Sequence, residues 1–164
     1  RQARMISALH LRGGILPEFL SFEWFPPHHC ILDDNCLSRT PALLNEYIRR
    51  LRLIPGLSKC PLRLTEFGTA FDRPTALKSV AIGGLYVLTA LEFFASGGDS
   101  AFVYGYEPGY MPRRRDTESY GLLRIDNEGR IAGVSAAHTA LRLLLQQCSL
   151  AHGRHVLIPV PNTP

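Results

Sequence analysis

The stretch Leu62-Arg63-Leu64-Thr65-Glu66-Phe67-Gly68 decides the fold, because it joins a short strand-like run to a carboxylate and then to a glycine. This arrangement presents an acid at the mouth of a closed parallel sheet, where catalytic side chains gather. Glu66 is therefore the leading catalytic candidate. The structural alternative is a glutamate that caps the strand or pairs with Arg63 or Arg73.

Two further apolar or β-rich runs, Phe19 to Phe25 and Ala101 to Tyr106, lie about 40 residues on either side of this stretch. Helix-like sequence follows each run, over residues 40–51, 75–96 and, near the end, 134–148. Strands that are joined through helices run parallel, because the crossover returns the chain to the same end of the sheet. The pattern predicts an α/β fold.

The helix signals are specific at the first of these segments. Thr40 is a suitable N-cap and Pro41 suits the first helical position. Apolar residues then repeat on one helical face, namely Leu44, Tyr47, Ile48 and Leu51. In the last segment the expected apolar face consists of Val134, Ala137, Leu141, Leu144 and Cys148.

The third run leads into a long polar loop and then into a predicted β-hairpin. Residues 120–125 and 130–131 flank Asp126-Asn127-Glu128-Gly129, which supplies residues that favour turn conformations. Residues 154–160 have the composition of one more strand, and the prolines after them discourage regular structure.

The composition is that of a globular, soluble protein, with 46% hydrophobic and 20% charged residues among 164. The net charge of +4 is scattered, and its densest run, Arg113-Arg114-Arg115, lies beside acidic residues, so we expect no nucleic-acid partner. The longest apolar stretch, Val80 to Ala95, is shorter than a membrane span. Because the chain begins at Arg1 without a secretion signal, we expect a missing N-terminal portion and assign no compartment.

On these residues the chain resembles the retaining glycoside hydrolases built on (β/α)8 barrels, the cellulase and β-xylosidase type. Their nucleophile strand is usually written Thr-Glu-Phe/Trp-Gly, as in Thr65-Glu66-Phe67-Gly68. The three runs resemble strands six to eight of the TIM barrel, and residues 120–145 resemble the hairpin and final helix. The resemblance implies a partial barrel domain over residues 1–152, a strand-like tail over 153–164, and a missing N-terminal half of the barrel.

In this family the glutamate after strand seven attacks the anomeric carbon, which implies Glu66 as the nucleophile on a carbohydrate substrate, with no metal or organic cofactor. The acid/base residue of the family follows an asparagine at the end of strand four, and that strand is absent here. Asn45-Glu46 falls in a predicted helix and Asn127-Glu128 in a predicted turn, so neither pair is assigned.

The expected substrate-binding residues follow the ends of the outer strands: Glu23, Trp24, Tyr104 and Tyr106. Aromatic side chains stack on the apolar faces of sugar rings, and a carboxylate binds sugar hydroxyls. The family more often has histidine and tyrosine near Glu23 and Phe25, so these two residues are departures. The alternatives are a salt-bridged acid for Glu23 and ordinary packing for the aromatic residues.

The remaining chemical groups carry weaker signals. The loop at residues 26–36 combines His28, His29, Cys30 and Cys36 with acidic residues, but its spacing fits no standard zinc site. A disulfide between its cysteines or two free thiols are both allowed. The position of His138, on or beside the apolar face of the last predicted helix, favours a core histidine over a metal ligand. Two rival functions stay open: a non-catalytic carbohydrate-binding or interaction module, and a truncated remnant. The oligomeric state is open as well.

Overall fold

A computed structural model of the chain describes residues 8, 12–13, 17–25, 39–68, 79–105, 122–126 and 128–147. Its elements in chain order are β1 (Leu20–Trp24), α3 (Thr40–Arg52), β2 (Leu62–Phe67), α4 (Ser79–Ala95), β3 (Ser100–Val103), β4 (Leu123–Ile125), β5 (Ile131–Val134) and α5 (Ala136–Gln147). The first three strands form a parallel sheet in the order β1-β2-β3, and β4 pairs with β5 antiparallel. The predicted α/β class with a parallel sheet is confirmed.

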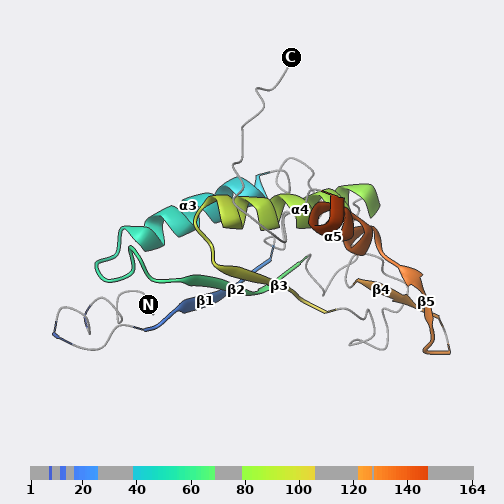
Figure 1. Cartoon of the computed structure of the whole chain (residues 1–164), viewed down its shortest axis with the longest axis horizontal. Coiled ribbons are helices and arrows are strands. Elements are labelled where there is room, and N and C mark those ends of the chain that lie inside the picture. The colour runs from blue at the N-terminus through green and yellow to red at the C-terminus, as the bar shows by residue number, and fades with distance from the viewer. Residues whose placement is uncertain are drawn as a thin grey trace, which may run out of the picture.

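All three long helices lie on one side of the parallel sheet (Figure 1). The core fills the space between them and is made of the inward side chains of the strands and the inner faces of α3 and α4. Its most buried members are Leu44, Ile48, Leu62, Leu64, Phe67, Tyr86, Phe93 and, from α5, Ala137. We call the opposite side, turned away from α3 and α4, the far face of the sheet.

The central strand contains a β-bulge. Phe22 pairs with Leu64, but the next residue of β1, Glu23, pairs with Glu66. On the other side of β2, three steps from Leu64 to Phe67 match only two steps along β3. Both ladders therefore place one extra residue in β2 between Leu64 and Phe67.

The side chains explain why the bulge is favourable. Leu62 and Leu64 are fully buried, so regular alternation would turn Glu66 into the core and Phe67 out to the far face. Burying an unpaired carboxylate costs free energy, and so does exposing a phenylalanine. With the extra residue, Phe67 returns to the core at 2% exposure and Glu66 stays outside it.

Helix α3 begins one residue earlier than the sequence indicated. Its N-cap is Arg39, which makes no side-chain capping hydrogen bond, and Thr40 is already helical and fully buried, so the prediction of Thr40 as the N-cap is wrong. Of the predicted inner face, Leu44, Ile48 and Leu51 are in the core. Tyr47 lies at its margin, against the rings of Phe22 and Trp24.

Helix α4 is buried on several sides because it packs against the sheet, α3 and α5. Its close approach to α5 depends on Gly83, where a Cβ atom would lie 2.9 Å from the carbonyl oxygen of Ala136. The helix ends in a Schellman motif. Gly98 donates its N–H to the Phe93 carbonyl, and Gly97, with φ +83, donates to the Phe94 carbonyl.

One arginine ties the ends of two helices together. The Arg52 guanidinium, at the end of α3, donates to the carbonyls of Leu57 and Cys60 in the following loop. It also donates to the carbonyl of Gly97, just past the end of α4, at 2.9 Å. A guanidinium carries several N–H donors, so this one side chain bridges the loop after α3 and the end of α4.

The predicted hairpin is present as β4 and β5. The carboxylate of Asp126 accepts the backbone N–H groups of Glu128 and Arg130 and holds the turn, while Gly129 supplies the left-handed residue with φ +80. The last helix starts later than expected. Val134 ends β5, and Ser135 caps α5 by accepting the backbone N–H of His138 at 3.2 Å.

Several predictions fall outside the described residues: the strand-like tail at 153–164, the loop at 26–36 with both of its cysteines, and Cys148 on the last helix. Within the described part, Cys60 is a buried free thiol. No helix there has the length and apolar character required to cross a membrane.

Candidate functional site

The two predicted carboxylates are brought together by neighbouring strands. Glu23 is the next-to-last residue of β1 and Glu66 the next-to-last residue of β2, and the two are register partners in the parallel ladder. Both project from the far face, Glu23 exposed and Glu66 half-buried. Adjacent strands lie about 4.8 Å apart, so the two acids share one small region at the carboxyl ends of the strands.

The surroundings of Glu66 favour its neutral form. Partial burial raises the pKa of its carboxyl above the ordinary value, and the negative charge of Glu23 raises this pKa further. A raised pKa at paired carboxylates is typical of sites that handle protons or bind a cationic or polar ligand.

The structural alternative for Glu66, an ion pair with Arg63, does not agree with the contacts. Arg63 lies 4.0 Å from the ring centroid of Phe19, and its Nε is 3.7 Å from Oδ2 of Asp99. Both partners lie toward the start of the strands, away from Glu66. The other predicted partner, Arg73, is outside the described residues.

Aromatic rings from the outer strands meet beside the carboxylates. Phe25, directly after β1, and Tyr104, directly after β3, contact edge to face with centroids 5.7 Å apart. Gly68, directly after β2, leaves room there, because a Cβ atom at this position would lie 3.6 Å from the Phe25 ring. The same Cβ would lie 2.9 Å from the hydroxyl oxygen of Tyr86 on α4.

Three residues were missed from the sequence. Phe25 was noted only as a departure, and Tyr86 was expected only as part of an apolar helix. Phe102, an exposed residue of β3 whose two strand neighbours pack against the core, was not considered. Alternation along β1 and β3 was the available signal, since Glu23 and Phe25 share one face, as do Phe102 and Tyr104. Nothing in the sequence places Tyr86 beneath Gly68.

The same alternation places Trp24 on the opposite side from Glu23. The indole packs on the helix side of the sheet, against the hydrophobic core and 5.9 Å from the ring of Tyr47. Neighbouring residues of a regular strand cannot face the same side. The position of Trp24 is therefore that of a packing residue, the alternative to a sugar contact, and it does not adjoin the carboxylates.

Two further residues singled out in the sequence are Tyr106 and His138. Tyr106 lies outside the described residues. His138 is half-buried in the first turn of α5, on a helix that packs against α4. Among the described residues, no group of three His, Cys, Asp or Glu side chains is placed to hold a metal ion.

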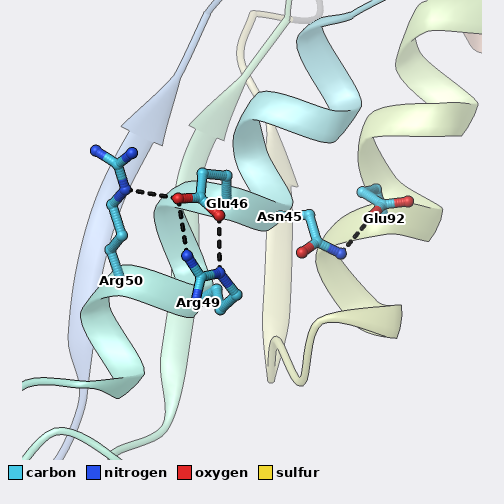
Figure 2. Close-up of polar contacts among 5 residues, drawn as sticks. All are labelled: Asn45, Glu46, Arg49, Arg50 and Glu92. Carbon is cyan, nitrogen blue, oxygen red and sulfur yellow. Dashed lines mark hydrogen bonds and ion pairs between the residues drawn. The ribbon is translucent and has the colours of Figure 1, made fainter.

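Asn45 and Glu46 lie in α3, as expected, and their contacts account for both side chains (Figure 2). Asn45 donates to Glu92 of α4 at 2.6 Å. Glu46 accepts hydrogen bonds from Arg49 and Arg50, which lower the pKa of its carboxyl to about 2. A general acid requires a raised pKa, so Glu46 has the wrong environment for that role.

Comparison with known proteins finds two similar solved structures. One is the hyperthermostable endo-1,4-beta-D-mannanase from Thermotoga petrophila RKU-1, with 19% identity and a TM-score of 0.45 over 79% of this chain and 33% of that chain. The other is the endo-beta-1,4-mannanase from Thermotoga petrophila, with 17% identity and a TM-score of 0.46 over 85% of this chain and 28% of that chain. The chain thus spans a third or less of the length of each. No family model and no curated protein matches.

Proposed function

We propose that this chain forms the nucleophile-bearing part of a retaining glycoside hydrolase, corresponding to strands six to eight of a (β/α)8 barrel, with Glu66 as the nucleophile. The observation that carries the proposal is the position of Glu66 at the carboxyl end of the central parallel strand, opposite Glu23 on the neighbouring strand. Catalytic residues of parallel barrels lie at this end of the strands.

The chemistry needs more than Glu66. A carboxylate oxygen of Glu66 would bond to the anomeric carbon while the bond to the leaving oxygen breaks, and that oxygen takes the electron pair and must gain a proton. Glu66 must be ionised for the attack, and its raised pKa shifts this requirement to higher pH. The proton donor is expected on a part of the barrel beyond this chain, and Glu23 binds the sugar.

The proposal is tested with a substrate that needs no proton donor. Dinitrophenyl glycosides release a stable phenolate, so the folded chain should release up to one equivalent per molecule and retain a glycosyl group. Peptide mass spectrometry should locate that group on Glu66. Glu66→Gln should abolish both signals, and Glu46→Gln, on the outer surface of α3, should leave both unchanged.

A second measurement separates the roles of Glu23. If Glu23 binds the sugar, the substitution Glu23→Gln should weaken the labelling of Glu66 by substrates with every kind of leaving group. If Glu23→Gln spares the dinitrophenyl substrates but abolishes turnover of unactivated glycosides, Glu23 is the proton donor and the half-site proposal is wrong.

The non-catalytic alternative predicts a different result. A folded chain that binds sugar, as measured by calorimetry, and forms no covalent adduct with any dinitrophenyl glycoside would contradict the nucleophile role of Glu66. Tyr104→Ala would then identify the binding site, because the backbone N–H of Tyr104 donates to the carbonyl of Phe67, the residue after Glu66, whereas Trp24 packs on the helix side of the sheet. A folded chain with neither binding nor labelling would support a remnant.

A further inference from the structure

A side-chain hydrogen bond links the bulge in β2 to β1. Thr65, directly before Glu66, donates its hydroxyl to the carbonyl oxygen of Phe22, directly before Glu23, at 3.1 Å. The bond therefore joins the two residues that precede the two carboxylates. It lies at the step where the register between the strands shifts by one residue.

The register shift decides which way Glu66 points. Without the extra residue, Glu23 would lie opposite Thr65, and Glu66 would lie opposite Trp24 and turn toward the helices. A bulged residue also leaves the ladder locally short of backbone hydrogen bonds. The Thr65 hydroxyl supplies a cross-strand bond at this point and favours the bulged pairing over the regular one.

We propose that Thr65 is a positioning residue, whose hydroxyl holds the bulge so that Glu66 stays opposite Glu23 on the far face. The geometric part of this proposal is independent of glycosidase activity, and its consequence for nucleophilic attack rests on the proposed function. Bulges beside active sites commonly aim a side chain in this way.

The groups around Glu66 allow the positioning to be measured through its titration. Glu23 of β1 is the charged neighbour that acts on Glu66. Arg63 of β2 is turned to Asp99. The electrostatic coupling between Glu23 and Glu66 thus reports their proximity.

The experiment follows the Glu66 side-chain carboxyl carbon by NMR during a pH titration, with and without Glu23→Gln. With threonine or serine at position 65, Glu23→Gln should lower the pKa of Glu66, because the neighbouring charge is gone. With Thr65→Val, which keeps the shape and loses the hydroxyl, this lowering should shrink to less than about half. A lowering of equal size in the valine background would overturn the proposal.

Two controls keep the result specific. Thr139→Val removes a comparable bond, from the Thr139 hydroxyl to the Ser135 carbonyl in α5, and should leave the coupling unchanged. Thr65 is exposed and valine suits a strand, so the variant should fold. If Thr65→Val does not fold, Thr65→Ala takes its place in the same comparison. Full coupling between Glu23 and Glu66 in the alanine variant would then overturn the proposal.

The same variants separate the two proposals. Lost coupling in Thr65→Val, together with slower labelling of Glu66 by the dinitrophenyl substrate, supports both. Lost coupling in a protein that is never labelled supports the positioning role and contradicts the proposed function.

Discussion

The carboxyl of Glu66 couples the site to the stability of the fold. Folding raises its pKa through burial and the charge of Glu23, so the ionised form is less favourable in the folded chain than in the unfolded one. The stability contributed by the protonated form is complete below the unfolded pKa and is lost as the pH rises through the folded pKa.

Glu66→Gln should therefore raise the free energy of unfolding near neutral pH and change it little at about pH 3.5, where both states are protonated. Urea unfolding at the two pH values measures the difference. Glu46→Gln provides a control of opposite sign, because the pKa of Glu46 is lowered to about 2 and its ionised form stabilises the fold above the ordinary value of 4.5. Equal effects of Glu66→Gln at both pH values would contradict the raised pKa.

Single residues show what a sequence pattern can and cannot place. Glu23 and Glu66 lie near the ends of their strands, as the sequence indicated, and their roles stay predictions. Trp24 was grouped with Glu23 by adjacency, although neighbours in a strand face opposite sides. The contact between Phe25 and Tyr104 joins residues from strands that are not adjacent in the sheet, and no local pattern reports such a contact.

Two neighbouring glycines in α4 provide a test of how closely this helix packs against α5. A Cβ at Gly83 would meet the Ala136 carbonyl at 2.9 Å, whereas a Cβ at Gly84 would meet nothing within 4 Å. Gly84→Ala should stabilise the fold by about 0.5–1 kcal/mol through helix propensity. Gly83→Ala should destabilise it by about 1–3 kcal/mol, because α5 must move away. Chemical denaturation of both variants measures the difference, and stabilisation by Gly83→Ala would show that the helices are not in close contact.

The elements themselves were largely predictable. The periodicity of 3.6 residues located α3, the long apolar stretch Val80 to Ala95 located α4, and short apolar runs located β1 to β3. Boundaries were less certain, as at Thr40 and Val134, because capping residues are common in several adjacent positions. The bulge was not predicted, although the order of leucine, glutamate and phenylalanine in β2 conflicts with regular alternation.

The guanidinium of Arg52 connects the end of α3 to the following loop and to the end of α4, so its contribution to the stability of the fold can be measured. Arg52→Met keeps the aliphatic stem and should cost about 1–2 kcal/mol, since three carbonyls lose a charged donor. Urea unfolding gives the cost, and hydrogen exchange should show faster opening near Gly97. Arg50→Met, which removes only the surface pair with Glu46, should have little effect. Equal effects of the two variants would contradict the role of Arg52.

Two features of the overall arrangement could be predicted from the sequence. Strands joined through helices had to be parallel, and an apolar α4 had to be covered on several sides. The tie made by Arg52 could not be predicted, because its three acceptors are backbone carbonyls, which every residue carries. The sides of the sheet taken by Glu66 and Phe67 depended on the bulge and were therefore equally hidden.

The extra residue in β2 has a consequence for how this gene segment tolerates change. Because Thr65 is the extra residue, its deletion would leave Leu64, Glu66 and Phe67 in regular alternation, with Glu66 still outside the core and Phe67 still inside it. The loss of this one codon should therefore be compatible with the core, although it removes the hydrogen bond to the Phe22 carbonyl.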